Sequence, residues 1–374
     1  MNSTAAVSNF TKCLDFELWN NGLKVLQLLI VYRVTLTTYL GLPISLIGIV
    51  TSAMSVILFS KDHLTPPTTR RLLLSMSVVD IVFPLASTLY LQPVMLCGRN
   101  CRYVGIFFSV SYLLPVSSLV NIFEMLRNWL VVLICVERFI ITCYPLKARR
   151  WLSVAKVNVL VAVCAISSVL FRTPYMASIA VEKCGNAYAN TLHRLRQIHS
   201  TTDAIMVTLL PLLILTVCSV QICRSIRHAE LTHGRIGRKS EPLRRTRGKV
   251  TRVLLIVIVV FAILMLPLVP VNILAFNWFP EGAACRVLIA RQIFSPLAVF
   301  GSLLHSAANF FIYVVYWGKY RRILMDLFKG TDRQTRGLSR TSTLHTNDVI
   351  SSRSFGVPLS SKIHLKHNFP DSVC

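Results

Sequence analysis

The sequence predicts an all-α membrane protein: a seven-transmembrane helix bundle with a short amphipathic eighth helix. Three observations lead to this fold class. Of the 374 residues 54% are hydrophobic, only 15% are charged, and the apolar residues gather into runs long enough to cross a bilayer. Soluble domains carry about 25% charged residues. The length would allow two soluble domains, but the composition favours one membrane-embedded bundle.

Each expected span is a run of roughly 20 largely apolar residues, the length that a helix needs to cross a bilayer core of ~30 Å. Backbone groups in lipid must be satisfied within the segment, which favours helices, and barrel strands would show ~10-residue alternation instead. The third run is longer than needed, so we expect it to pass beyond the lipid on the inner side. The seven runs lie near residues 36–59, 71–96, 104–136, 152–175, 203–223, 251–276 and 293–316.

A shorter amphipathic stretch follows the last span and predicts a helix lying on the membrane surface. It runs from Lys319 to Phe328, and one face carries Tyr320, Ile323, Leu324, Leu327 and Phe328. Beyond Gly330 the chain is polar and rich in Ser and Thr, which is typical of disorder. We therefore divide the chain into an extracellular N-terminus (1–35), the bundle with its amphipathic helix (36–328) and a disordered cytoplasmic tail (329–374).

The net charge of +25 would suggest a nucleic-acid partner in a soluble protein. Here the basic residues avoid the apolar runs and gather in alternate connections, most densely between Arg224 and Arg252. The positive-inside rule then places the N-terminus outside and the C-terminus in the cytoplasm of a multi-pass plasma-membrane protein. The partner of the basic residues is therefore expected to be anionic lipid rather than nucleic acid. Two glycosylation sequons, at Asn2 and Asn9, agree with this orientation.

Neither a metal site nor an enzyme active site can be found in the sequence. Eleven cysteines are spread without metal-ligand spacing; Cys97 and Cys101 form a C-x3-C pair, but no matching Cys/His pair follows. No Ser/His/Asp set, H-E-x-x-H motif or phosphate loop appears. The sequence therefore predicts a protein that is not an enzyme and that needs no metal or cofactor.

The third span ends in an acid–arginine pair, Glu137-Arg138-Phe139, with Pro145 seven residues beyond the arginine. A guanidinium at the membrane edge can be held by its neighbouring carboxylate in one state and can turn to backbone carbonyls of a partner in another. The alternative is a boundary arginine that snorkels to the interface.

Four further motifs stand in four other spans: Asp80 in the second, Pro211 in the fifth, Phe261 to Pro267 in the sixth, and Asn309-Phe310-Phe311-Ile312-Tyr313 in the seventh. Together with the acid–arginine pair they resemble the rhodopsin-like G-protein-coupled receptors over roughly residues 36–328. The N-F-F-x-Y form is similar to the peptide-receptor branch that includes FMRFamide-type receptors and related orphans. The resemblance implies coupling to a heterotrimeric G protein, and activation through Glu137, Arg138, Phe139, Phe261, Pro267, Asn309 and Tyr313.

The chain also departs from the family pattern. Ser45 stands where most members carry Asn, Cys164 where Trp is usual, and Met265 where the sixth helix commonly has Trp. Leu113 occupies the usual cysteine position of the third span, so the resemblance implies that Cys184 is bridged to Cys97 or Cys101 instead. The sixth helix begins with Arg247 rather than an acid, which implies modest basal activity, since the salt bridge that some relatives use to hold Arg138 is missing.

Ionisable residues inside a membrane are expensive, at about 2.5–3.5 kcal/mol or more each, and mark function. Three stand out: Asp80, Glu124 and Arg127. By the resemblance, Arg127 falls where many members bind sodium beside the Asp of the second helix. We hypothesise that Arg127 supplies this cation permanently, paired with Asp80 in a cluster with His305, Ser306 and Asn309; the alternative is an i,i+3 pair with Glu124. A lone His such as His305 is more often a hydrogen-bonded core residue than a ligand.

The resemblance also narrows the ligand. Val120 stands where monoamine receptors carry Asp, and no Lys in the seventh span could hold retinal. A peptide remains as the expected ligand, and a chemosensory or lipid ligand of a receptor with the same fold is the alternative. A transporter is the alternative to a receptor. Candidate pocket residues, for which simple helix packing is an equal alternative, are Tyr90, Asn121, Glu124, Asn272 and Gln292. The Ser/Thr-rich tail suggests receptor kinases and arrestin as further partners.

Overall fold

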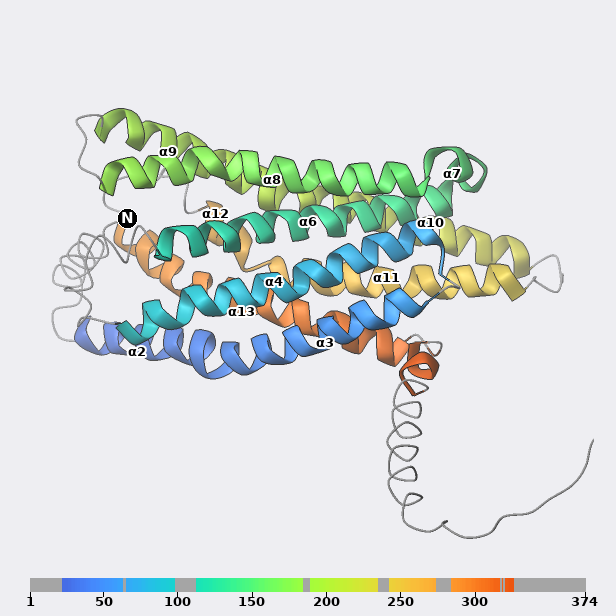
Figure 1. The fold of residues 1–374 in the computed structure, drawn as a ribbon, viewed down its shortest axis with the longest axis horizontal. Coiled ribbons are helices and arrows are strands. Elements are labelled where there is room, and N and C mark those ends of the chain that lie inside the picture. The colour runs from blue at the N-terminus through green and yellow to red at the C-terminus, as the bar shows by residue number, and fades with distance from the viewer. Residues whose placement is uncertain are drawn as a thin grey trace, which may run out of the picture. The chain divides into compact units, whose positions relative to one another are not determined.

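A computed structural model (Figure 1) describes residues 22–62, 65–97, 112–183, 189–234, 242–273, 284–316, 318 and 320–325. Throughout these ranges the chain is helical apart from short turns, and no strand occurs in them. The chain divides into two units at Leu324, and the helices below lie in the first. The expected glycosylation sites Asn2 and Asn9, the cysteines Cys101 and Cys184 and the tail lie outside the described residues, as does the side chain of Cys97.

The first two spans are long continuous helices. The first consists of α2 (Gly22–Val34), the π-helical turn η1 (Thr35–Leu40) and α3 (Gly41–Lys61), so it begins earlier than the expected residue 36. The second is α4 (Pro67–Cys97). The first span is longer than the roughly 20 residues that a helix needs to cross the bilayer. Its outer extension, before residue 36, carries exposed residues such as Gln27.

The next three spans follow the expected order. The third is α6 (Leu114–Cys143), which runs beyond the expected inner end at 136, and the short α7 (Pro145–Trp151) follows it. The fourth is α8 (Val154–Lys183). The fifth joins α9 (Ala189–Asp203), the π-helical turn η4 (Ala204–Leu209) and α10 (Leu210–Gly234).

The sixth span is broken and the seventh is continuous. The sixth consists of α11 (Pro242–Met265) and α12 (Leu268–Ile273), and the seventh is α13 (Ala284–Tyr316). The break falls at Leu266 and Pro267 because proline has no N–H for the helical ladder; the freed carbonyl of Ile263 accepts a 3.2 Å hydrogen bond from the Leu266 N–H. Within the described residues six helices are long and apolar enough to cross a membrane, and the shorter apolar Thr251–Met265 supplies the sixth of the seven spans.

The long helices run roughly side by side, and α6 lies at the centre, in contact with α4, α8, α10 and α11 (Figure 1). α13 packs against both α3 and α11. Small residues allow the closest approaches: Gly48 lies against Ala307, and Gly301 lies against the Leu264 carbonyl. The outer faces expose large apolar side chains such as Leu170 and Leu213, as expected for lipid contact. Polar and charged side chains are therefore concentrated inside the bundle, where they form the site.

Of the expected eighth helix, residues 320–325 are helical, while Lys319, Leu327 and Phe328 lie outside the described residues. The first of these helical residues differs from the expectation that Tyr320 faces the membrane: the ring is 1% exposed and packs at 5.1 Å from Phe59 and 5.7 Å from Tyr313 between ring centroids. Phe59 and Tyr313 also meet edge to face, at 5.5 Å. Burial raises the pKa of the Tyr320 phenol. The helix is therefore anchored by an aromatic contact with the first and seventh spans, because a large amphipathic ring gains more by packing against them than by lying at the interface.

Candidate functional site

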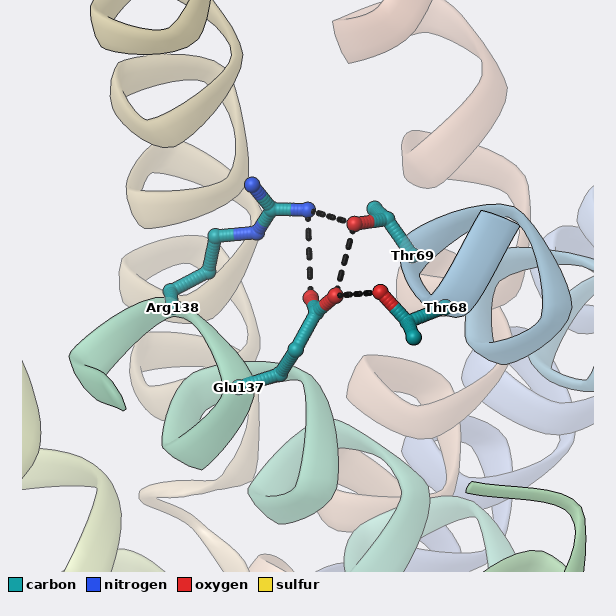
Figure 2. Close-up of polar contacts among 4 residues, drawn as sticks. All are labelled: Thr68, Thr69, Glu137 and Arg138. Carbon is teal, nitrogen blue, oxygen red and sulfur yellow. Dashed lines mark hydrogen bonds and ion pairs between the residues drawn. The ribbon is translucent and has the colours of Figure 1, made fainter. Parts of the chain in front are cut away.

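The inner end of the bundle holds a buried ion pair between Glu137 and Arg138, adjacent residues on α6 (Figure 2). The Arg138 Nη2 lies 3.1 Å from Glu137 Oε2, and the two side chains are 3% and 2% exposed. Two buried charges are tolerated only when they are paired and further hydrogen bonded, since each one has given up its hydration. The remaining partners of this pair therefore matter as much as the pair itself.

Those partners are two hydroxyls in the first turn of α4 (Figure 2). Thr68 and Thr69 donate to Glu137 Oε1 at 2.9 and 2.7 Å, and Thr69 Oγ1 also accepts a hydrogen bond from Arg138 Nη2. The start of a helix carries partial positive charge, which adds to the stabilisation of the carboxylate. We call Thr68, Thr69, Glu137 and Arg138 the inner clasp. The two threonines could not be identified from the sequence, since the expected second span begins only near residue 71; their place directly after Pro67, a residue favoured in the first turn of a helix, is the local signal they give.

The next residue, Phe139, lies half-buried beside the clasp and meets Tyr144 edge to face, with 5.7 Å between ring centroids. Tyr144 connects α6 to α7, and Lys147 lies 5.9 Å above its ring. Phe139 thus helps to fix the end of α6. Among the described residues it makes no hydrogen bond or ring contact with the ion pair.

The middle of the bundle holds a second polar group, the central cluster: Asp80, Arg127, His305, Ser306 and Asn309. Asp80, on α4, is 1% exposed and accepts hydrogen bonds from Ser306 Oγ at 3.1 Å and Asn309 Nδ2 at 2.8 Å, both on α13. A buried carboxylate requires such donors. The polar residues of the second and seventh spans therefore hold α4 and α13 together in the membrane interior.

Arg127 reaches this cluster from α6, and its side chain is fully buried. Its Nη1 donates to the Ser302 carbonyl at 2.9 Å and to Ser306 Oγ at 3.5 Å, and its guanidinium carbon lies 4.1 Å from the centre of the Phe83 ring. Among the described residues neither expected direct ion pair, with Asp80 or with Glu124, is formed. The guanidinium is instead drawn onto the Phe83 ring and the Ser302 carbonyl, so that Ser306 bridges it to Asp80.

His305 lies beside the cluster, fully buried, with its ring 4.9 Å from Phe261 in an edge-to-face contact. Neither ring nitrogen has a hydrogen-bond partner in the described part of the chain, which differs from the expected hydrogen-bonded histidine. Ser302, one turn earlier on α13, contacts the Met265 sulfur at 3.9 Å. Phe261 and Met265, on the sixth span, therefore rest directly on the polar face of α13, while Pro267 sits at the break above them.

The outer half of the bundle contains a narrow cleft between the third, fifth and sixth spans, lined by Asn128, Val207, Thr208, Phe261 and Met265 among others. Asn128 donates to the Val207 carbonyl at 2.9 Å, and Asn272 donates to Thr208 Oγ1 at 2.6 Å. The Val207 carbonyl is free to accept because Pro211, four residues later, has no N–H. The other candidate pocket residues, Tyr90, Asn121, Glu124 and Gln292, are all half-buried.

Sequence reasoning missed one charged pair in this outer half. Arg172 on α8 and Asp203 at the end of α9 form an ion pair of 2.8 Å, with the arginine side chain 5% and the aspartate side chain 27% exposed. Beside them His199 stacks against Phe171 and Tyr175, with ring centroids 4.8 and 4.9 Å apart. Both charges lie inside or at the edge of expected spans, so the rule applied to Asp80 and Arg127 would have found them.

Comparison with known proteins gives matches over most of the chain. The sequence model described as "7 transmembrane receptor (rhodopsin family)" matches residues 51–313. Opsin-VA from Rutilus rutilus is 26% identical over 241 residues, which are 62% of this chain and 59% of the relative. The FMRFamide receptor from Drosophila melanogaster is 24% identical over 306 residues, 76% of this chain and 52% of the relative. The chain thus spans little more than half the length of these relatives.

Among solved structures, squid rhodopsin has a similar fold. The TM-score is 0.59 at 14% sequence identity, and the alignment covers 81% of this chain and 87% of that chain. At this identity the likeness concerns the fold alone, and it agrees with the arrangement of helices around α6.

Proposed function

The chain belongs to the rhodopsin family of seven-transmembrane receptors, and we propose that it relays the binding of an extracellular peptide to a heterotrimeric G protein. Members of this family are receptors rather than enzymes. The observation that carries the proposal is the inner clasp, an ion pair held closed by two hydroxyls of a neighbouring helix. Such a contact can be closed or open, and the two states differ in whether the Arg138 guanidinium is occupied or available at the inner surface.

In the closed state the Arg138 guanidinium is occupied by Glu137 and Thr69. Movement of α6 relative to α4 withdraws Thr68 and Thr69 from the pair. The Arg138 side chain can then turn away from Glu137 to new acceptors, which backbone carbonyls of a G protein would provide. A receptor can shift such an equilibrium only if its ligand binds one state more tightly than the other. The ligand is therefore expected to act on the outer halves of the same helices.

The peptide class rests on two features. One relative is an FMRFamide receptor, whose name denotes an amidated Phe-Met-Arg-Phe peptide. The seventh span, α13, contains no lysine, so a retinal Schiff base cannot form on it and the opsin relative is the poorer guide to the ligand. The half-buried residues Tyr90, Asn121, Glu124, Asn272 and Gln292 are the proposed contact residues.

The central cluster is proposed to work without a bound sodium ion. Arg127 brings a permanent positive charge to Asp80 through Ser306, which is the role that sodium plays in many members of the family. The orientation, with the N-terminus outside the plasma membrane and the tail in the cytoplasm, is supported by the basic residues in the connections on one side. We further propose that receptor kinases phosphorylate the tail and that arrestin binds the phosphorylated receptor after signalling.

A signalling screen tests the proposal. The full chain is expressed in cells with a promiscuous G protein and challenged with amidated peptides, beginning with Phe-Met-Arg-Phe-amide. We expect a dose-dependent response in the wild type that is lost in Arg138→Ala at equal surface expression. Silence to every peptide at normal expression would refute the peptide ligand, and an undiminished response in Arg138→Ala would refute the role of the clasp.

A further inference from the structure

The short connection between α7 and α8 carries an exposed hydroxyl, that of Ser153. Leu152 and Ser153 are the two residues between these helices, and Leu152 has an extended backbone, with φ −101° and ψ 102°. The Ser153 Oγ accepts a hydrogen bond of 3.3 Å from the Lys156 main-chain nitrogen. The hydroxyl thus lies at the surface on a segment outside the helices, where another protein can reach it.

Other hydroxyls near the inner end of the bundle are placed differently. Thr68 and Thr69 are buried in the inner clasp. Ser60 is exposed, but it belongs to α3 and its hydroxyl donates to the Val56 carbonyl at 2.7 Å. Ser153 differs from these three residues in being both exposed and outside a helix.

The surroundings of Ser153 are basic along the chain. Arg150 stands three residues before it and Lys156 three residues after it, and from Glu137 to Glu182 no Asp or Glu intervenes. The first turn of α8 accordingly lacks the acidic residue that the positive start of a helix favours. A connection with this charge attracts an acidic partner surface, and it stabilises a negative group attached to the serine.

An exposed hydroxyl with an arginine three residues before it fits the charge pattern by which one class of protein kinases selects its substrates. Acidic side chains in the substrate groove of such a kinase bind the guanidinium and so place the hydroxyl at the reacting phosphate. A basic residue on the far side of the acceptor, here Lys156, extends the same complementarity.

We infer that Ser153 is a phosphorylation site for a protein kinase that recognises basic residues on both sides of its acceptor. The Ser153 Oγ attacks the γ-phosphorus of ATP, an O–P bond forms, the bond from that phosphorus to the ADP oxygen breaks, and the hydroxyl proton passes to a base of the kinase. The inference rests on the orientation in the proposed function, which places this connection in the cytoplasm, and it adds a modification site within the bundle.

The phosphate changes the contact between α7 and α8. The Lys156 ammonium donates to the Arg150 carbonyl at 3.1 Å, and this carbonyl belongs to the last turn of α7, where helical carbonyls need donors from outside the helix. A phosphate on Ser153 carries about −1.5 to −2 charges and is a stronger acceptor than a carbonyl. Lys156 therefore moves to the phosphate, and the end of α7 loses this hydrogen bond.

α7 in turn is connected to the end of α6. Tyr144 contacts the Phe139 ring with 5.7 Å between centroids and the Trp151 ring with 6.4 Å. Lys147 lies 5.7 Å above the Trp151 ring. Phosphorylation of Ser153 thus acts on the aromatic contacts that fix the end of α6 beside the inner clasp.

A kinase assay tests the site. The full-length receptor in detergent is incubated with ATP and the catalytic fragment of protein kinase C, and phosphate on each residue is quantified by mass spectrometry. Ser339 is the internal reference, because Arg336-Gly-Leu-Ser339 repeats the spacing of Arg150-Trp-Leu-Ser153. We expect phosphate on both serines. In Arg150→Gln we expect labelling of Ser153 at least about tenfold slower, the effect of losing one charge-assisted hydrogen bond, and unchanged labelling of Ser339.

Three outcomes overturn the inference. Phosphate on Ser339 but not on Ser153 shows that the folded connection excludes an active kinase. Phosphate on neither serine excludes this class of kinase, since its activity is verified on a standard peptide. Equal labelling of Ser153 in the wild type and Arg150→Gln shows that the arginine is not recognised. Detergent leaves both ends of the bundle accessible, so a wrong orientation or a wrong ligand class produces none of these results.

Amide hydrogen exchange tests the transfer of Lys156. We expect the α7 amides to exchange severalfold faster after phosphorylation of the wild type, because a hydrogen bond that holds the last turn is lost. Ser153→Ala, which is phosphorylated only elsewhere, is the matched control and should show no such change. Lys156→Met should exchange at the faster rate before and after phosphorylation. Exchange in the wild type that phosphorylation leaves unaltered would overturn the proposed effect on α7.

Discussion

The hydroxyl of Thr69 on α4 lies 2.7 Å from the Glu137 carboxylate on α6, and the same oxygen accepts a hydrogen bond from Arg138. One small side chain thus touches both members of the buried ion pair and ties them to a neighbouring helix. The two charges are adjacent in sequence and would stay paired without Thr69. The contact with Thr69 adds the connection between α6 and α4, on which the closed inner surface depends.

Thr69→Val keeps the shape of this side chain and removes its hydroxyl. A hydrogen bond to a charged group contributes about 1.5–3 kcal/mol, and a shift of even 1 kcal/mol changes an equilibrium about fivefold. We expect basal nucleotide exchange by the G protein to rise several-fold at equal surface expression. Thr69→Ser, which retains the hydroxyl, is the matched control and should behave as the wild type. Unchanged basal exchange in the valine variant would exclude a restraining role for Thr69.

Arg127→Met should destabilise the receptor, because it leaves Asp80 as a buried charge without its cation. Loss of one partner from a direct buried ion pair typically costs about 3–5 kcal/mol; Arg127 and Asp80 are connected through Ser306, so we expect a smaller loss. The double variant Asp80→Asn/Arg127→Met removes both charges and should recover much of the lost melting temperature in detergent. Equal stabilities of the single and double variants would show that the two charges do not interact.

The wild-type receptor should be insensitive to sodium. Basal nucleotide exchange in membranes is measured while sodium chloride replaces choline chloride at constant ionic strength, so that general screening is unaltered. We expect no change, because the Arg127 guanidinium already occupies the polar interior next to Ser306 and Asp80. A clear dependence on millimolar sodium in the wild type would contradict the built-in cation.

Exchange of the charges at Arg172 and Asp203 tests the outer ion pair. Each single reversal, Arg172→Asp or Asp203→Arg, places two like charges close together in a poorly solvated region, and surface expression should fall sharply. The double reversal restores opposite charges and should recover part of the expression. A double variant no better than the worse single variant would mean that the 2.8 Å contact contributes little.

Gly301→Ala should be poorly tolerated, because an added Cβ would overlap the backbone carbonyl of Leu264. Relief requires α11 and α13 to separate, and overpacking of this kind typically costs about 1–3 kcal/mol. Gly48→Ala is the matched control: its Cβ would meet the Ala307 nitrogen at 3.5 Å, an ordinary contact. We expect a lower melting temperature for Gly301→Ala only.

The helices and their order could be predicted from the sequence because length and apolarity decide what crosses a bilayer. The ion pair between Glu137 and Arg138 was predicted as well, because the two residues are adjacent and carry opposite charges. Partners on other helices were not: Thr68 and Thr69 are separated from Glu137 by nearly seventy residues. Only tertiary packing shows that these hydroxyls face the carboxylate.

The direction of a long side chain is equally difficult to predict. The family resemblance placed Arg127 near Asp80, and i,i+3 spacing placed it near Glu124. Neither direct pair forms, because the Phe83 ring and the Ser302 carbonyl compete for the guanidinium. Tyr320 likewise fits an amphipathic pattern on sequence grounds and is drawn inward by Phe59 and Tyr313. In both residues the outcome depends on aromatic rings from other helices.

The π-helical turn at Ala204–Leu209 changes how this chain is to be aligned with its relatives. A π-turn accommodates one residue more than an α-turn, and one residue corresponds to a rotation of about 100° around the helix axis. Counting outward from Pro211 in a receptor whose fifth helix is straight therefore assigns the wrong neighbour to every residue beyond the turn. Asp203, the first such residue, faces Arg172 in this chain; contact maps transferred from straight-helix receptors need a one-position offset from there to the outer end of α9.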